Sequence, residues 1–167
     1  MEKIIKTFLY IIACALIFWL IANFYNGSLK QNTPASAFEW EREVSVYFID
    51  KNKAGFSSCA ADMPVIRKVI NAETLGPGAI EVLIKGPTSE ESNTLYSALN
   101  PDALLQKFEI RCGVAYVDFS ESLNEGVAGS CNVFAIRSQI ENTLKALPDI
   151  DSVVISVNGQ TEGILEP

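Results

Sequence analysis

Carboxylates are the only side chains in this sequence that are numerous enough to suggest acid–base catalysis. The chain has 20 Asp and Glu residues and no histidine. The absence of histidine removes the usual general base at neutral pH, the Ser/His/Asp and Cys/His arrangements, and most catalytic zinc sites. A glycosidase needs two carboxyl groups that face each other at about 5–10 Å. The candidates are Asp50, Asp118, Glu121 and Glu125, and none has a partner at a spacing that places both on one side of a single element.

Asp118 lies in residues 112–120, CGVAYVDFS, whose alternation predicts a strand. Ala115, Val117 and Phe119 share one face of this strand, and we expect them in the core. Asp118 falls on the other face, with polar neighbours, close to the end of the strand. A carboxylate in this place most often accepts hydrogen bonds from the backbone N–H groups of the following turn. We therefore predict that Asp118 caps a turn and does not act as a catalyst.

Two basic residues, Lys85 and Arg67, are candidates for a binding role. Lys85 precedes Gly-Pro-Thr, but this stretch lacks the strand and the glycine loop that a phosphate cradle needs. We predict that Lys85 lies at the end of a helix, where its positive charge interacts favourably with the free carbonyl groups of the last turn. Arg67 lies within PVIRKV, and a binding role and a place on a solvated strand face are equally consistent with the sequence.

Cys59, Cys112 and Cys131 have wide spacings that resemble no zinc knuckle. One disulfide with one thiol left over fits an oxidising compartment. The alternative is that all three are small buried hydrophobic residues. The sequence leaves the pairing open, and a bond from Cys112 would go to Cys131 or to Cys59. We predict no catalytic residue, no cofactor and no metal site.

Length and charge limit the class of protein. The chain has 167 residues, of which 49% are hydrophobic, which is enough for one membrane segment and one globular domain with an ordinary core. The formal net charge is -7. An acidic surface repels the phosphate backbone, so nucleic acid is excluded as the expected partner.

The first thirty residues predict a membrane anchor. No charged side chain lies between Lys6 and Lys30, and residues 8–22 are uninterruptedly apolar. A helix of about 20 such residues crosses a bilayer. Lysines before the run and aromatic residues towards its far end indicate a cytoplasmic N-terminus. Lipidation at Cys14 and cleavage of a secretory signal are the alternatives. On each interpretation the rest of the chain lies outside the cytoplasm.

We therefore expect four parts. They are a short cytoplasmic N-terminus at residues 1–6, a transmembrane anchor at 7–25, a flexible tether at 26–40 and an extracytoplasmic domain at 41–167.

The extracytoplasmic domain shows the patterns of an α+β fold. Runs of β-branched and aromatic residues predict strands at 44–50, 64–70, 104–110, 114–120 and 151–158. Apolar stripes with start and stop signals predict two helices, from Thr74 to the Gly86-Pro87 stop and from a Ser130 cap to Leu147. We expect a single mixed sheet of about five strands, with both helices packed on one face.

With these elements in place, the chain resembles the sporulation and spore germination domain, called the GerMN domain. The resemblance covers nearly all of residues 44–160. The matching pieces, in order, are VYFID (46–50), PVIRKV (64–69), LIKGPTSEE (83–91), LNP (99–101), GVAYVDFS (113–120), QIENTL (139–144) and VVISVNG (153–159).

The resemblance implies a bacterial, membrane-tethered domain that belongs, in the best-known cases, to envelope assemblies built during sporulation. It implies a fold similar to the ring-building α+β modules of such complexes, and no established catalytic residues. Family members are often lipoproteins, tandem copies or fusions to cell-wall enzymes, whereas this chain carries a single copy behind its expected anchor.

The sequence thus favours a non-enzymatic protein-interaction or assembly module of the cell envelope, which binds another envelope protein or a second copy of itself. The alternative is an accessory module that binds peptidoglycan and assists a hydrolase. A carboxylate-dependent hydrolase that uses Asp118 is a third interpretation.

Overall fold

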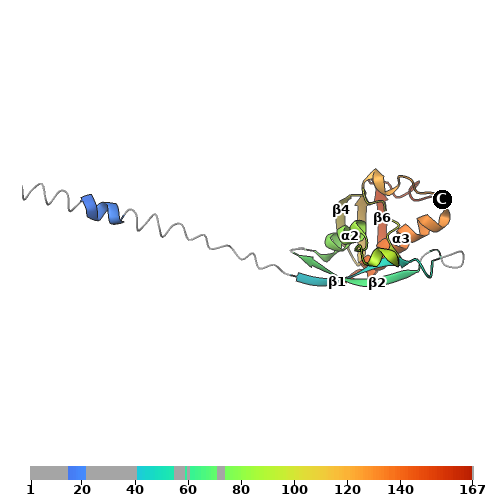
Figure 1. Cartoon of the computed structure of the whole chain (residues 1–167). Helices are drawn as coiled ribbons and strands as arrows, with labels where there is room; N and C mark the ends of the chain where they lie inside the picture. The colour runs from blue at the N-terminus through green and yellow to red at the C-terminus, as the bar shows by residue number, and fades with distance from the viewer. Residues whose placement is uncertain (1–14, 22–40, 55–58, 60, 71–73, 167) are drawn as a thin grey trace, which may run out of the picture. The chain divides into compact units, whose positions relative to one another are not determined.

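The structure is a computed structural model that describes residues 15–21, 41–54, 59, 61–70 and 74–166 (Figure 1). The chain divides into two units, Met1–Glu39 and Trp40–Pro167. In the first unit, residues 15–21 form a helix. No helix in the described ranges is long and apolar enough to cross a membrane. Most of the expected anchor at 7–25, and all of the expected tether at 26–40, lie outside the described residues.

The second unit is an α+β fold with two three-stranded sheets. The first sheet has the order β2-β1-β3 and the second the order β4-β5-β6. All pairs are antiparallel except β5 with β6. The strands are β1 Glu41–Asp50, β2 Asp62–Ile70, β3 Leu95–Tyr96, β4 Leu105–Arg111, β5 Val114–Phe119 and β6 Ser152–Val157; the helices are α2 Leu75–Lys85 and α3 Ser130–Lys145, with 3-10 turns η1 Glu91–Asn93 and η2 Glu121–Leu123.

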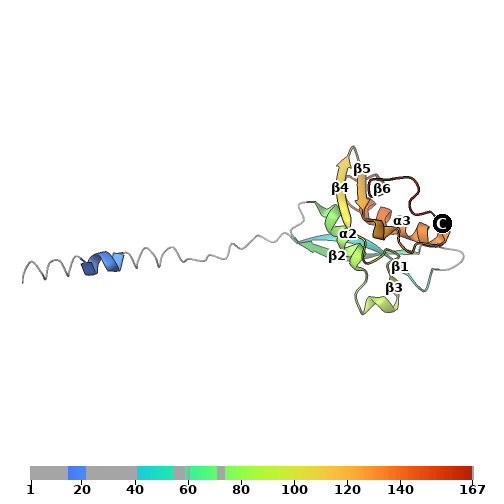
Figure 2. The ribbon, with the colours of Figure 1, turned by 90° about the horizontal axis from the view of Figure 1, so that it is seen from above.

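The α+β class and the predicted strands and helices are confirmed, but the expected single sheet is wrong. Both helices contact strands of both sheets: α2 packs on β1, β2 and β4, and α3 packs on β1, β2 and β6 (Figure 1, Figure 2). The helices therefore do not cover one face of one sheet. They separate two sheets.

Hydrogen bonds from α3 explain why the sheet is split. β1 pairs with β3 only at Ile49 and Asp50. Beyond that point, the N–H of Tyr47 donates to Thr143 Oγ1 at 3.0 Å, and Gln139 Nε2 donates to the Tyr47 carbonyl at 2.9 Å. The N–H of Ala98 donates to Gln139 Oε1 at 2.7 Å. Side chains of a helix thus occupy the backbone groups that a further strand would need.

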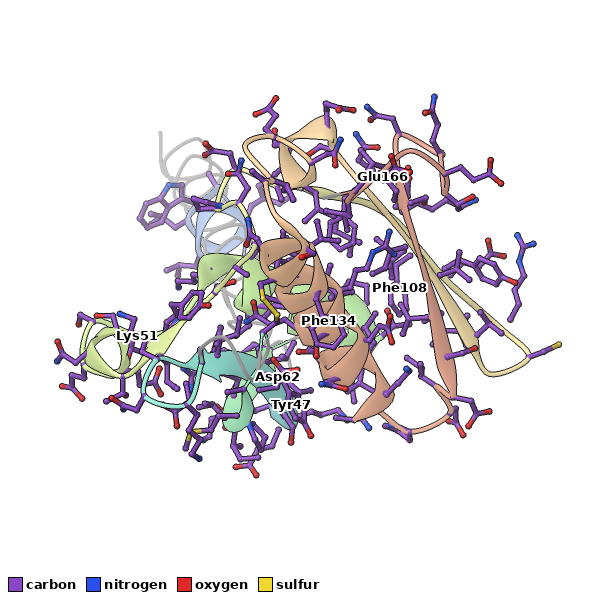
Figure 3. The ribbon with its side chains drawn as sticks, turned by 90° about the vertical axis from the view of Figure 1, so that its right-hand side faces the viewer. Tyr47, Lys51, Asp62, Phe108, Phe134 and Glu166 are labelled. Atoms are coloured by element: carbon purple, nitrogen blue, oxygen red, sulfur yellow. A yellow bond between two sulfur atoms is a disulfide. The ribbon has the colours of Figure 1, made fainter. Side chains whose placement is uncertain are left out.

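A second contact holds α3 at the same place. Asn142 Nδ2 donates to Asp62 Oδ2 at 2.6 Å, and the Ser138 hydroxyl donates to the same oxygen. Figure 3 shows Tyr47 and Asp62 beside α3. The polar residues of α3 are therefore bound to the ends of both long strands, β1 and β2.

The core fills the space between the sheets and the helices. The predicted stripe of α3 is buried, and so are Ala115, Val117 and Phe119 of β5, each at most 1% exposed. At about 25 cal/mol per Å² of buried apolar surface, each fully buried Val, Leu, Ile or Phe side chain contributes about 1.5–3 kcal/mol to the stability of the fold. The core residues that lie in the strands and the two helices are Val44, Val46, Phe48, Val69, Ala79, Ile80, Leu83, Leu95, Ala115, Val117, Phe119, Val133, Ile136, Ile140, Leu144, Ile155 and Val157.

Local signals are confirmed at most of the element ends. Thr74 is the N-cap of α2, and Gly86 ends this helix with φ 80°. At α3, Gly129 takes the cap position with φ 83°, and the predicted cap Ser130 is the first helical residue. A non-glycine residue is strained at this φ, which explains why glycine and not serine holds the cap position.

The β4–β5 hairpin turns on Cys112 and Gly113, with φ of 49° and 77°. Two positive φ values in a two-residue loop are typical of a type I′ turn, whose twist suits the strands. A Cβ atom on Gly113 would lie 2.5 Å from Asp151 Oδ2. The Asp151 N–H donates to the Gly113 carbonyl at 2.7 Å, so the turn is fixed to the segment that leads into β6.

Cys59 and Cys131 form a disulfide across 72 positions of sequence, with Cα atoms 4.7 Å apart. Cys112 is exposed and makes no disulfide. Of the two alternatives that the sequence left open, one bond with one remaining thiol holds, and the bond runs from Cys59 to Cys131 and not from Cys112. The bond joins the segment before β2 to the first turn of α3, and closing a loop of this length contributes about 4 kcal/mol.

Candidate functional site

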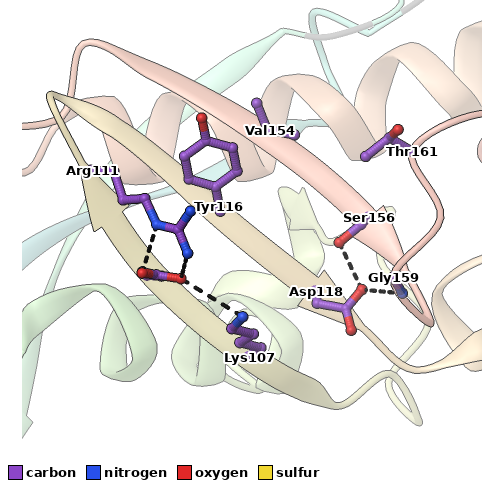
Figure 4. A pocket seen from close by; sticks show the side chains of 9 residues that line it. Lys107, Arg111, Tyr116, Asp118, Val154, Ser156, Gly159 and Thr161 are labelled. Atoms are coloured by element: carbon purple, nitrogen blue, oxygen red, sulfur yellow. Dashed lines mark hydrogen bonds and ion pairs between the residues drawn. The ribbon is translucent and has the colours of Figure 1, made fainter.

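The outer face of β4-β5-β6 carries a hollow of about 250 Å³ (Figure 4). Because side chains alternate along a strand, the residues between the buried positions of β5 and β6 point to this face. We call it the Tyr116 hollow, after its exposed aromatic ring. Its lining residues are Lys107, Glu109, Arg111, Tyr116, Asp118, Val154, Ser156, Gly159 and Thr161.

One wall of the hollow is a set of paired charges on β4. Arg111 Nε and one terminal nitrogen donate to the two oxygens of Glu109, both at 2.6 Å. Lys107 Nζ lies 3.7 Å from Glu109 Oε2. The hydrogen bonds from Arg111 lower the pKa of Glu109 against the opposing effect of desolvation. The Arg111 guanidinium also lies 5.7 Å from the centroid of the Tyr116 ring, so this wall holds the ring in place.

A β-bulge aligns this wall with β5. The pairing of β4 with β5 shifts between Leu105 and Lys107, which leaves Lys107 opposite Asp118. An extra residue in one strand redirects the side chains that follow it. The bulge therefore lets a cation and a carboxylate face each other across the floor of the hollow.

Asp118 forms the opposite end of the floor. Its Oδ1 accepts from the Gly159 N–H at 2.7 Å and from the Ser156 hydroxyl at 2.6 Å. The prediction that Asp118 caps a turn is confirmed, but the turn is the one after β6 and not the one after its own strand. β5 and β6 run parallel, so their carboxyl ends meet at the same edge of the sheet.

The other candidate carboxylates do not join Asp118 in the hollow. Asp50 Oδ1 accepts from the Asn52 N–H at 2.9 Å, and this bond, aided by Lys53, lowers the pKa of Asp50. Glu121 accepts from Asn158 Nδ2 at 3.1 Å, and Glu125 is exposed. Among the described residues, no three His, Cys, Asp or Glu side chains come together as a group that could hold a metal.

Arg67 has a structural partner. Its guanidinium forms an ion pair with Glu91 and lies 5.5 Å from the centroid of the Phe48 ring. Glu91 Oε2 also accepts from the Thr88 N–H at 2.9 Å, which is one of the two hydrogen bonds of a capping box. The Arg67 side chain is only 18% exposed. A place on a solvated strand face does not fit this low exposure, and the binding role stays a prediction. In the structure, Arg67 fixes the turn after α2 onto β1 and β2.

Sequence reasoning missed an exposed apolar edge. β2 is an outer strand, and β1 is the one strand that pairs with it in the described part of the chain. Met63, Ile66 and Ile70 are 43%, 57% and 52% exposed. We call these three residues the β2 edge. The available signal was Pro64, which is typical of an edge strand because it has no N–H to donate.

The comparisons with known proteins identify the family. The sequence model of the family described as "Sporulation and spore germination" (Germane) matches residues 45–163. The chain belongs to this family. The resemblance drawn from the sequence is thereby confirmed, and the described unit is a GerMN domain.

Solved structures agree with this assignment. The tandem GerMN domains of the sporulation protein GerM from Bacillus subtilis match with a TM-score of 0.61 and 26% identity, over 72% of this chain and 40% of that chain. This chain thus spans less than half of the tandem structure. The first GerMN domain of the same protein matches with a TM-score of 0.58 and 24% identity, over 72% of this chain and 85% of that chain. No curated protein matches the chain.

Proposed function

We propose that this chain is a non-enzymatic protein-interaction or assembly module of the bacterial cell envelope, with a role in sporulation or germination. In this proposal, residues 7–25 anchor the chain in the membrane, and lipidation at Cys14 is the alternative anchor. Residues 26–40 are the tether, and residues 41–167 lie outside the cytoplasm. The partner is another envelope protein or a second copy of this chain, and the net charge of -7 argues against nucleic acid.

The β2 edge is the observation that carries the proposal. An outer strand presents a row of unpaired N–H and C=O groups to which an extended segment can add. Ile66 and Ile70 share one face of this strand and Met63 lies on the other, and all three add apolar surface beside the edge that a partner would bury. Pro64 and Lys68 on the same strand limit unselective pairing.

Two further observations support the proposed location. The apolar run at 8–22 has the composition of a membrane span. The Cys59–Cys131 disulfide fits a compartment that is oxidising, such as the outside of the cytoplasmic membrane.

Site-specific crosslinking in living cells tests the proposal. A photo-reactive amino acid at Ile70, which is 52% exposed, should crosslink to an envelope protein or to a second copy of the chain. The matched control is the same amino acid at Phe134 on α3, which is 56% exposed. Adducts from position 70 and none from position 134 would support the proposal. No adduct from position 70, or equal adducts from both positions, would contradict it.

A further inference from the structure

We propose that the Tyr116 hollow binds a neutral, N-acetylated sugar unit of a glycan chain. The proposal concerns a different surface from the β2 edge and stands whether or not the protein-interaction role is correct. It rests on three properties of the hollow: its charge balance, its mixture of flat and polar surfaces, and its rigidity.

The charges of the hollow cancel. Lys107 and Arg111 carry two positive charges, Glu109 and Asp118 carry two negative charges, and Glu109 is bound to both cations. A phosphate or another anion would have to compete with Glu109 for Arg111. A cation would meet Arg111 and Lys107 at the wall. A neutral ligand needs no counter-charge, so the hollow favours a neutral ligand in a protein that is strongly acidic as a whole.

The lining offers what a sugar ring needs. Tyr116 is 41% exposed, and its ring stands between Arg111 on one side and Val154 on the other (Figure 4). Aromatic rings bind the C–H faces of flat ligands, and Val154 adds an apolar surface for the methyl group of an acetamide. Glu109 and Asp118 are acceptors, the Ser156 hydroxyl donates to Asp118 and can accept from a ligand, and the Thr161 hydroxyl can both donate and accept. Hydroxyl groups around a ring require such a mixture.

The hollow is small and preformed. Its volume of about 250 Å³ is below the range of about 300–1,000 Å³ that is usual for drug-sized ligands. One or two sugar rings fit this space better than a large cofactor does. Most of the lining residues stand on three strands, and hydrogen bonds hold the pairs Arg111–Glu109 and Ser156–Asp118, so binding costs little ordering of the protein.

Chemical-shift titration of the purified full-length chain tests the proposal. The probe is the linear tetramer of N-acetylglucosamine, and the comparison probes are inorganic phosphate and a wall-type Ala-Glu-Lys-Ala peptide. For a ligand that contacts the protein with about one ring, we expect a Kd of about 1 mM. The shifts should cluster at Tyr116, Val154 and Ser156. No saturable shift with the sugar, or tighter binding of phosphate or the peptide, would overturn the proposal.

Variants locate the binding. Tyr116→Ala should weaken sugar binding about tenfold, whereas Tyr116→Phe, which keeps the ring, should bind almost normally. Thr161→Trp should block the hollow from an exposed position outside the sheet, and it replaces Tyr116→Ala if that variant does not fold. Phe134→Ala removes an exposed aromatic ring elsewhere and should leave the affinity unchanged. Unchanged affinity in Tyr116→Ala or in Thr161→Trp would contradict the assignment.

Discussion

The two sheets expose surfaces of different chemistry. The sheet β2-β1-β3 ends in a nine-residue outer strand with apolar side chains in solvent, and the sheet β4-β5-β6 exposes a face whose charges are already paired. An apolar edge gains most of its binding energy from the surface that a partner buries. A balanced polar face gains little from burial and selects its ligand by hydrogen bonds. The two proposals therefore place a protein partner at one sheet and a small ligand at the other.

The first sheet also differs between its two sides. On the β1 side, Gln139 and Thr143 occupy the backbone groups of Tyr47. On the β2 side, no described element does the same. Among the described residues, the helix thus closes one edge and leaves the other open, and the open edge is the one at which the proposed partner strand would add.

The largest expected effect comes from opening the closed edge. Gln139 is fully buried, and Gln139→Leu leaves the Tyr47 carbonyl and the Ala98 N–H without partners. We expect the free energy of unfolding, measured by urea denaturation, to fall by about 3 kcal/mol. The control Gln106→Leu changes an exposed glutamine on β4 and should cost less than about 0.5 kcal/mol. Equal losses in the two variants would show that α3 does not close the edge.

A smaller effect is expected from Glu91, which fixes the turn after α2 to the first sheet. The hydrogen bond from Arg67, followed by that from the Thr88 N–H, lowers the pKa of Glu91. A carboxyl group whose pKa is lowered by folding stabilises the protein at pH values above the ordinary pKa of glutamate, which is about 4.3. This stabilisation is lost as the pH falls through the lowered pKa of the folded state. Glu91→Gln should cost about 1–2 kcal/mol at neutral pH.

The pH dependence provides the check on Glu91. From neutral pH down to about pH 3, the free energy of unfolding, measured by urea denaturation, should fall less for Glu91→Gln than for the unchanged chain. For Glu125→Gln, which changes an exposed residue, the free energy of unfolding should fall with pH as it does for the unchanged chain. If the free energy of unfolding of Glu91→Gln falls with pH as much as that of the unchanged chain, the ion pair with Arg67 does not contribute to stability.

The smallest effect is expected on the outer face of the second sheet. Arg111 and Glu109 are 62% and 36% exposed, and exposed ion pairs contribute little to stability. Arg111→Gln should therefore leave the melting temperature nearly unchanged. It should nevertheless weaken sugar binding, because Arg111 holds the Tyr116 ring in place. A large fall in the melting temperature would show that this pair serves folding and not a ligand.

Periodicity predicted the parts of the fold that follow from apolar burial. The α3 stripe and the core face of β5 were evident because Ile136, Ile140 and Val117 recur at the spacing of their element. Asp118 was placed correctly as a turn cap because a carboxylate near a strand end has few other roles.

Long-range polar contacts could not be predicted from periodicity. Gln139 and Thr143 lie on the buried side of α3, but nothing local shows that they bond to Tyr47, more than ninety positions away. The single predicted sheet failed for this reason. The Cys59–Cys131 pairing also depends on how α3 approaches β2, and the two residues of β3 are too few to form a pattern.

We propose that the two sheets bind different partners. Ile66→Lys and Tyr116→Ala test this most directly when each variant is measured both by crosslinking from position 70 and by titration with the sugar. Ile66→Lys should abolish the crosslink from position 70 and leave the Kd for the N-acetylglucosamine tetramer unchanged. Tyr116→Ala should weaken the sugar about tenfold and leave the crosslink intact. Loss of both activities in either variant, with the fold intact by circular dichroism, would contradict the account.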